Sequence, residues 1–349
     1  MPLPEGFCPG RVVIVRPRGL GDVVLSSAVI DALTRAWPDA RLDFITERAS
    51  RELLEPDARL DGIFLLDGED RDARIRGGGL RSAVSWVRER SPDLLLDLFS
   101  NPRTAWLTAM SGVPFRVGLD KRVRRFAYNV RVPRFHGPPE EDHRWARDVQ
   151  LDFLRNAGIR WAGEAKASVA LTPEDAAFAE RVLPDLGYAP GTSFATVLPG
   201  GSWESKRWSV EGFAAAGRAA AECLGAPTLV CWGPPEREDA EAIASRLGDA
   251  GRLAPPSRLR EMAALLARSA LTVSTDCLGR HFAVVQGVPT VGIFGTTDPR
   301  DWTPPDGPHR TVRGGPEEGY PSLRDFPADA VVAAVRDLLA EVDSGRAPL

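Results

Sequence analysis

The chain alternates short apolar runs with longer segments in which apolar residues recur every three or four positions. In the first half, runs rich in Val, Ile and Leu predict buried parallel strands at residues 12–15, 42–45, 63–66 and 94–98. Between the first two strands, apolar residues recur at helical spacing from Leu25 to Leu33, and Trp37-Pro38 ends that helix. Strands that alternate with helices predict an open, parallel α/β sheet.

The second half repeats this pattern after a clear helix start. Thr172 is a predicted N-cap, Pro173 takes the first helical position, and acidic residues fill the first turn. Apolar runs predict further strands at 194–198, 228–232, 271–273 and 290–294. Amphipathic segments predict helices at 211–224, 236–247, 259–266, 280–286 and 328–339. The second half is therefore predicted to be another α/β domain.

We place the domain boundary within residues 159–166, which gives domains of residues 1–165 and 166–349. An alternative is that the last helix packs back on the first domain. Residues 68–79 and 121–125, rich in glycine or in charge, are predicted to be mobile surface loops. Parallel α/β domains bind ligands beyond the carboxyl ends of their strands, and two such domains create a cleft there. Functional residues are therefore expected at the carboxyl ends of the strands.

Composition excludes several classes of protein. The 349 residues are 43% hydrophobic and 26% charged, with a formal net charge of −4, so nothing indicates a nucleic-acid binder. The cysteines form no CxxC pair and no zinc-ligand spacing, which favours a reducing compartment. No apolar run suits a signal peptide or a membrane helix of roughly 18 residues. We expect a cytoplasmic protein whose contact with any membrane is peripheral.

The loop from Arg16 to Asp22 is the first candidate for chemistry. Gly19 and Gly21 allow the backbone to pass close to a ligand, and the following helix offers free N–H groups. Asp22 stands where the loop becomes the helix, so it is either a functional carboxylate or a helix cap. The loop matches neither the GxGxxG dinucleotide motif nor the GxxxxGK[ST] phosphate loop.

A second candidate follows the strand at 194–198. Gly200, Gly201 and Ser202 come after the strand, and Lys206 follows at short reach, a combination that suits a diphosphate. The alternative is a surface turn with a solvated Lys-Arg pair. The chain has three lysines among 44 basic residues, which favours a special role for Lys206.

Polar residues also follow the remaining strands of the second half. Glu236 is placed to accept hydrogen bonds from ribose hydroxyls, or is a first-turn helix acid. Asp276 and His281 can reach one cleft if the turn between them folds back, although a lone histidine is often structural. Thr296 and Thr297 suit contacts with phosphate or sugar, or form a turn before Trp302.

These motifs, in this order, resemble glycosyltransferase family 9, the ADP-heptose:lipopolysaccharide heptosyltransferases. The segments that carry the resemblance are residues 16–22, 199–208, 232–236, Asp276 with His281, 287–290 and 294–299. Weaker matches in the first half are Asp97, Gly112, Arg116, Gly118 and His143. The resemblance covers nearly the whole chain. It departs at Asp276-Cys277-Leu278-Gly279, where the family has a Ser or Thr after the aspartate and its glycine one position earlier.

The resemblance implies a GT-B architecture of two facing Rossmann-like domains with parallel sheets. The first domain would receive the acceptor and the second the nucleotide sugar, ADP-heptose. Asp22 would be the catalytic base of an inverting displacement that needs neither a metal nor another cofactor. The residues implied to bind the donor are Gly201, Ser202, Lys206, Glu236, Asp276, His281, Thr296 and Thr297. Asp70-Arg71-Asp72 has the spacing of a metal motif but lies in a polar surface loop, so we assign no metal site.

Basic residues of the first half are the candidates for the acceptor. They are Arg18 of the first loop and Lys121, Arg122, Arg124 and Arg125. Inner-core lipopolysaccharide is anionic, and arginine pairs well with carboxylate and phosphate groups. The alternatives are a solvated loop or a patch attracted to an anionic membrane, and a lipid-linked acceptor would itself bring the protein to the inner leaflet. The competing functions are a sugar-nucleotide epimerase or hydrolase and a non-catalytic nucleotide-sugar-binding protein.

Overall fold

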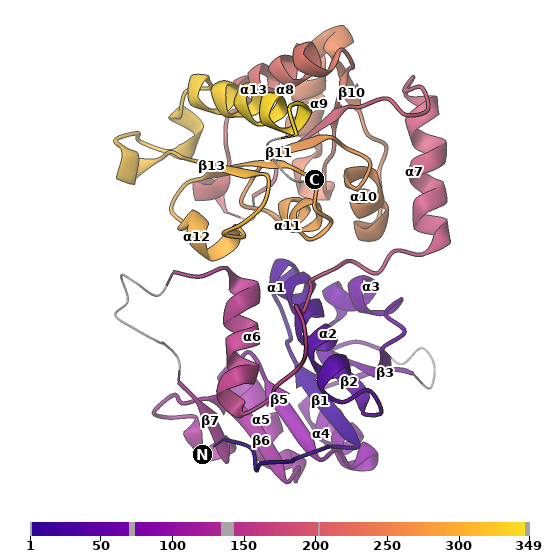
Figure 1. Cartoon of the computed structure of the whole chain (residues 1–349), viewed down its shortest axis with the longest axis vertical. Helices are drawn as coiled ribbons and strands as arrows, with labels where there is room; N and C mark the ends of the chain where they lie inside the picture. The colour runs from indigo at the N-terminus through magenta and orange to yellow at the C-terminus, as the bar shows by residue number, and fades with distance from the viewer. Residues whose placement is uncertain (1, 70–73, 134–142, 202, 346–349) are drawn as a thin grey trace. The chain divides into compact units, whose positions relative to one another are not determined.

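The computed structural model describes residues 2–69, 74–133, 143–201 and 203–345. The chain divides into two compact units, Met1–Ala170 and Leu171–Leu349, so the division falls a few residues beyond the predicted boundary. Each unit contains one sheet with helices packed on it (Figure 1). Among the described residues, no helix is long and apolar enough to cross a membrane.

The sheet of the first unit is parallel throughout, with the order β4-β3-β2-β1-β5-β6-β7. Its strands are β1 Arg11–Val15, β2 Arg41–Glu47, β3 Leu60–Leu66, β4 Ile75–Gly78, β5 Leu94–Asp97, β6 Phe115–Leu119 and β7 Val130–Val132. β1 lies between β2 and β5, and its residues from Val12 to Val15 are completely buried. The predicted strands of this half are confirmed.

The helices of the first unit are α1 Leu20–Leu25, α2 Ser27–Ala36, α3 Arg51–Leu54, α4 Leu80–Arg90, α5 Pro102–Ser111 and α6 Ala146–Ala157, with 3₁₀ turns η1 Arg48–Ser50 and η2 Arg125–Ala127. α4 and α5 pack on the sheet face that carries Val13 and Val15, where Trp86 fills the core beside Phe64. α2 packs against α6. A sheet of buried parallel strands requires helices on both of its faces.

Two expectations for the first half are wrong. The segment 68–79 is not entirely loop, because Ile75–Gly78 pairs with β3 as the edge strand β4. The first helix starts at Leu20, earlier than predicted, and a break at Ser26 divides it into α1 and α2. Strands β6 and β7 escape prediction as well, since Arg116 and Gly118 interrupt the apolar run of β6. Gly118 is needed there because the Tyr128 ring occupies the space of a side chain.

The sheet of the second unit is also parallel, with the order β10-β9-β8-β11-β12-β13. Its strands are β8 Ala195–Leu198, β9 Thr228–Val230, β10 Gly251–Leu253, β11 Leu271–Thr275, β12 Thr290–Phe294 and β13 His309–Arg313. The four predicted strands are confirmed, and the two edge strands β10 and β13 are additional. Both edge strands are largely half-exposed and carry arginine, so their sequences lack the continuous apolar run by which a strand is predicted.

The helices of the second unit are α7 Pro173–Asp185, α8 Val210–Leu224, α9 Arg237–Leu247, α10 Leu259–Leu266, α11 Leu278–Val285, α12 Pro299–Trp302 and α13 Asp329–Asp343. Five 3₁₀ turns join them, at η3 Glu204–Lys206, η4 Pro234–Glu236, η5 Gly248–Ala250, η6 Pro316–Glu318 and η7 Leu323–Asp325. The predicted cap of α7 is confirmed, because Thr172 and Asp175 form a reciprocal capping box.

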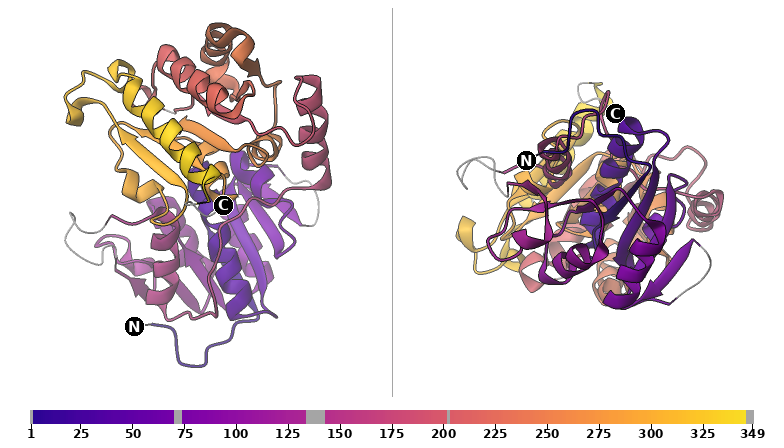
Figure 2. Two further views of the ribbon diagram at one scale, coloured as in Figure 1. Left: turned by 45° about the horizontal axis from the view of Figure 1, so that its top comes forward. Right: turned by 90° about the horizontal axis from the view of Figure 1, so that it is seen from below.

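The last helix, α13, packs within its own unit. It lies along α8 and against β12 and β13, as Figure 2 shows. Val331, Val335 and Leu338 on its apolar face are completely buried in the core of this unit. The apolar face of α13 is thus covered by its own unit rather than by the first one.

Candidate active site

The loop after β1 places Asp22 in the first turn of α1. Gly19 is the N-cap residue, in the left-handed conformation with φ 87°, and no side chain caps the helix. Asp22 is the third helical residue, and its carboxylate folds back so closely that a Cβ on Gly19 would lie 2.5 Å from Oδ2. Glycine is therefore required at position 19, and Asp22 is not the cap of this helix.

Arg16 holds the Asp22 carboxylate. Its Nη2 atom lies 2.5 Å from Asp22 Oδ1, and the two side chains are 12% and 25% exposed. The same guanidinium donates to the carbonyl of Leu98 at 3.3 Å and stacks on the Phe99 ring, as Arg18 does from 5.6 Å. The loop after β1 is thus tied to the loop after β5, and Asp22 is oriented by a charged partner.

The loop after β5 is built around Asp97. This completely buried carboxylate accepts hydrogen bonds from the Tyr128 hydroxyl at 2.7 Å and from the Ser100 backbone N–H at 2.7 Å. Burial raises the pKa of Asp97, and burial likewise raises that of Tyr128. Ser100 takes a left-handed conformation with φ 48°. The sequence marked Asp97 only as a weak match, and its structural role was not predicted.

The basic segment 121–125 is attached to this loop. Arg124 Nη1 donates to the Ser100 carbonyl at 2.7 Å, and Lys121 Nζ approaches the same oxygen at 3.4 Å. Arg122 and Arg125 are exposed, and within the described residues neither forms an ion pair. The structure therefore gathers Arg18, Lys121 and Arg124 at the loop after β5 and leaves the other two arginines facing solvent.

In the second unit, Lys206 and Asp276 form a partly buried ion pair. η3 places Lys206 Nζ 2.5 Å from Asp276 Oδ2, and the side chains are 20% and 5% exposed. Thr297 Oγ1 donates to the same oxygen at 3.0 Å. These residues follow β8, β11 and β12, so three strand ends that the sequence treated separately converge on one carboxylate oxygen.

The glycines after β8 give this cluster its close contacts. Gly201 has φ 151°, and a Cβ there would lie 3.0 Å from the Lys206 carbonyl oxygen. A Cβ on Gly200 would lie 2.6 Å from Cys277 Cβ, and the Gly200 carbonyl accepts a hydrogen bond from Thr275 Oγ1. Both glycines therefore allow close packing in this loop, and the predicted contact of Gly201 with the donor stays a prediction. Ser202, also predicted to bind the donor, lies outside the described residues.

His281 reaches the same cluster through Trp302. His281 is buried in α11, and its ring lies edge-on to the Trp302 ring at 5.6 Å between centroids. Lys206 Nζ lies 6.0 Å from the centroid of the same Trp302 ring. Trp302 therefore packs between His281 and Lys206 and joins them in one cluster.

Arg280, which the sequence analysis missed, fixes Trp302. Its completely buried guanidinium donates from Nη1 to the Trp302 carbonyl and from Nη2 to Thr303 Oγ1, each at 2.7 Å. Burial lowers the pKa of Arg280 to about 10, which leaves it charged at neutral pH. An arginine within the apolar run of α11 was the available signal. Buried arginine is rare without a specific partner.

We expect Arg280→Met to lower stability by about 1–3 kcal/mol, because the Trp302 carbonyl and the Thr303 hydroxyl lose their donors. Thermal unfolding should show this loss. The matched control is Arg300→Met on α12, where the arginine is exposed and pairs with Asp298, so little change is expected. An equal fall in melting temperature in both variants would contradict a special role for Arg280.

The departure from the family pattern has a structural reason. Cys277 is the N-cap residue of α11, and burial raises the pKa of its thiol to about 11, so the thiol stays neutral. Gly279 lies inside α11, where a Cβ would come 2.6 Å from Leu198 Cδ2. The displaced glycine thus allows α11 to pack closely on the end of β8.

The other described residues predicted to bind the donor, Glu236 and Thr296, are more exposed than Asp276. Glu236 ends η4 and is half-buried, and burial raises its pKa while nearby Arg207 opposes the shift. Thr296 is exposed. Across the described residues, no three or more His, Cys, Asp or Glu side chains gather in a way that could hold a metal ion. The Asp70-Arg71-Asp72 motif lies outside that part of the chain.

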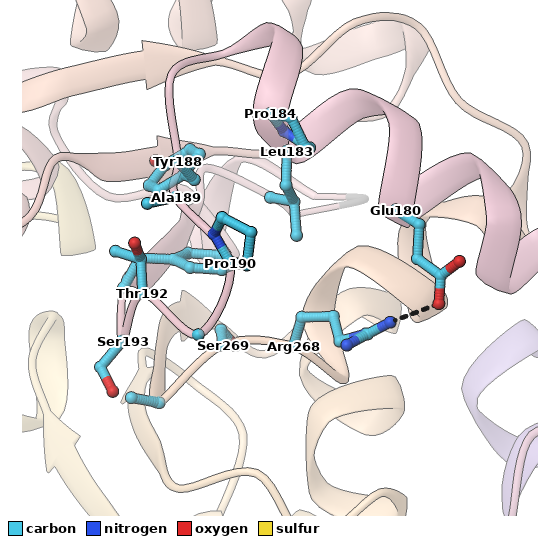
Figure 3. Close-up of a pocket in the computed structure, with 13 residues that line it drawn as sticks. Glu180, Leu183, Pro184, Tyr188, Ala189, Pro190, Thr192, Ser193, Arg268 and Ser269 are labelled. Atoms are coloured by element: carbon cyan, nitrogen blue, oxygen red, sulfur yellow. Dashed lines mark hydrogen bonds and ion pairs between the residues drawn. The ribbon is translucent and has the colours of Figure 1, made fainter.

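A separate pocket opens at the other end of this sheet. Its volume is about 530 Å³, and Figure 3 shows its lining residues. Ser193 and Phe194 precede β8 and Ser269 precedes β11, so the pocket lies at the amino ends of these strands. Glu180 and Arg268 pair across its rim at 2.9 Å. None of the candidate residues lines it.

Comparison with known proteins places these observations in a family. Residues 81–325 match the profile of glycosyltransferase family 9 (heptosyltransferase). Lipopolysaccharide heptosyltransferase 1 of Pseudomonas aeruginosa is 28% identical over 298 residues, which cover 83% of this chain and 79% of the relative.

Solved structures of low sequence identity share the fold. The crystal structure of a family 9 glycosyltransferase from Veillonella parvula superposes with a TM-score of 0.79 at 21% identity, covering 95% of this chain and 97% of that one. Escherichia coli ADP-heptose lipopolysaccharide heptosyltransferase II superposes with a TM-score of 0.75 at 18% identity, covering 95% and 99%. The predicted GT-B fold class is confirmed, and the chain belongs to glycosyltransferase family 9 and is a glycosyltransferase.

Proposed function

We propose that the protein transfers a heptosyl group from ADP-heptose to a hydroxyl of inner-core lipopolysaccharide or a related anionic glycan. Family membership supports a heptosyl donor, and the named activities of the relatives support a lipopolysaccharide acceptor. The observation that carries the donor assignment is the Lys206–Asp276–Thr297 cluster beside Trp302. It holds an oriented ammonium and a hydroxyl at adjoining strand ends, groups that can pair with a diphosphate.

The second unit is proposed to bind the nucleotide sugar. Asp276 already fixes the Lys206 ammonium at a strand end, so binding a diphosphate would cost little side-chain entropy. Gly201 allows the loop after β8 to pack closely against the Lys206 backbone, and Glu236 follows the neighbouring strand β9 as a partner for ribose hydroxyls. His281 and Trp302 supply an aromatic edge for the sugar.

The first unit is proposed to hold the acceptor and to activate it. An acceptor hydroxyl oxygen attacks the anomeric carbon, and Asp22 takes its proton. The new bond to that oxygen forms while the bond from the anomeric carbon to the diphosphate breaks. ADP leaves with its charge met by Lys206. A single displacement of this kind inverts the anomeric configuration.

Acceptor-dependent release of ADP tests the proposal against its alternatives. The purified protein is incubated with ADP-heptose, with and without an inner-core lipopolysaccharide fragment. A transferase releases ADP only when the fragment is present. A hydrolase or epimerase consumes ADP-heptose equally in both reactions, and a binding protein consumes it in neither, so either of these results would overturn the proposal.

We predict that turnover is independent of divalent cations. Lys206 supplies the positive charge at the leaving diphosphate, which in many transferases comes from a metal ion. Rates measured after removal of metal with EDTA should equal those of untreated enzyme. Loss of activity with EDTA and its return with Mg²⁺ or Mn²⁺ would contradict the prediction.

Exposed arginines of the basic segment are predicted to act on the acceptor. Replacing Arg122 and Arg125 together by glutamine should raise the acceptor KM about tenfold, because each loses a charged hydrogen bond to an anionic group. Arg124 is left in place, since it holds the Ser100 carbonyl. The control is the double variant Arg35→Gln with Arg155→Gln, which removes the same amount of positive charge from the first unit. If donor affinity falls instead, the roles of the two units are reversed.

A further inference from the structure

One face of the first unit exposes a cluster of large apolar side chains. Six large hydrophobic side chains of the described residues are exposed, and four of them belong to α5 and the segment that follows β6. These four are Trp106 at 55%, Met110 at 37%, Val123 at 79% and Phe126 at 54% of full exposure. Single exposed apolar residues are ordinary on a protein surface, but a cluster marks a site of interaction.

Trp106, Met110 and Phe126 lie together, and Val123 belongs to the same short segment as Phe126. The rings of Trp106 and Phe126 lie 5.3 Å apart between centroids. Met110 is one helical turn beyond Trp106 on the same side of α5. Underneath, Ala105 of α5 packs with Ala127 and Tyr128, which joins the two segments into one body. We call this face, with Arg122 and Arg125, the α5 surface.

The charge of the α5 surface is positive. Arg122 directly precedes Val123, Arg125 directly precedes Phe126, and both arginines are exposed. Within the described residues neither pairs with an acid. Arg124, between them, donates to the Ser100 carbonyl, which is a neutral acceptor. Exposed aromatic side chains next to exposed arginines form the pattern of interfacial membrane contacts, in which rings enter the headgroup layer and cations meet anionic lipids.

We propose that the α5 surface binds the surface of an anionic lipid bilayer, with Trp106, Met110, Val123 and Phe126 entering the headgroup layer. A second copy of the chain is a poorer occupant, because a symmetric contact would bring the arginines of both copies together. This inference rests on the proposed function in one respect: a lipid-linked acceptor is presented at such a surface. It places the membrane contact on the unit proposed to hold the acceptor.

Vesicle binding tests the α5 surface without any acceptor. The full-length protein is sedimented with vesicles of phosphatidylglycerol and phosphatidylcholine, and with vesicles of phosphatidylcholine alone. We expect binding to the anionic vesicles that weakens with salt. The double variant Trp106→Ser with Phe126→Ser should bind at least about tenfold more weakly. Trp203→Ser, which removes a tryptophan 70% exposed in the second unit, is the matched control and should bind like the parent.

Three further readouts separate the outcomes. Thermal unfolding checks that the double variant is folded. Transfer to a lipid-free acceptor fragment should be unchanged in this variant, because neither ring belongs to the proposed active site. If transfer fails in the parent while vesicle binding behaves as expected, only the proposed function is wrong. Equal vesicle binding by parent and folded double variant would overturn the inference, as would a dimer in sedimentation equilibrium that the double variant dissociates.

Discussion

Replacing Asp22 by asparagine should lower kcat by about 10²–10⁴-fold while the protein stays folded. Asparagine keeps the shape of the side chain but cannot accept the proton of the acceptor hydroxyl. The structure sharpens this prediction, because Gly19 rather than Asp22 is the N-cap residue of α1. The ion pair with Arg16 is partly exposed, so its loss should cost about 1 kcal/mol or less of stability.

The control for Asp22→Asn is the same change at Asp148. Asp148 also lies in the first turn of a helix, α6, and pairs with a neighbouring arginine, Arg147, at 2.8 Å. Both variants are measured for kcat at saturating donor and acceptor, and for melting temperature. Asp148→Asn should retain the parental kcat. A folded Asp22→Asn protein that turns over within a few-fold of the parent would leave the proposed mechanism without a base.

Replacing Lys206 by alanine should weaken the binding of ADP-heptose by about 10–100-fold. The diphosphate loses its ammonium partner, and the buried Asp276 carboxylate loses its cation and then repels the phosphates. Thr297 still donates to Asp276, which keeps the carboxylate partly satisfied. The variant is therefore expected to fold.

Calorimetric titration of the parent and of Lys206→Ala with ADP-heptose measures this effect. Lys166→Ala is the matched control, because Lys166 is exposed in the first unit and carries the same charge. Its donor affinity should equal that of the parent. Unchanged affinity in a folded Lys206→Ala protein would show that the diphosphate binds elsewhere.

The central strands were predictable because burial makes their sequences apolar. Val12 to Val15 of β1 and Thr290 to Phe294 of β12 are entirely buried, so continuous apolar runs identify them. The edge strands β4 and β13 were not predictable from the same pattern. Ile75-Arg-Gly-Gly and His309-Arg-Thr-Val-Arg are mostly half-exposed and carry arginine or glycine, so only pairing with β3 and β12 reveals them.

The candidate site was predictable as a set of strand-end residues but not as a set of contacts. Lys206 and Asp276 stand 70 residues apart, and their ion pair depends on how β8 and β11 lie side by side. Arg280 was missed because its partners, the Trp302 carbonyl and Thr303, come from a loop more than 20 residues away. Tertiary contacts of this kind leave no local periodicity in a sequence.

The central claim is that one displacement carries the sugar from ADP directly to the acceptor oxygen, and the anomeric configuration of the product tests it most directly. The transferred sugar is examined by NMR after reaction of anomerically pure ADP-heptose with a defined inner-core fragment. The account predicts an acceptor that carries one added heptosyl residue whose anomeric configuration is opposite to that of the donor. Retention of the donor configuration, or ADP formed without any gain of sugar by the acceptor, would contradict it.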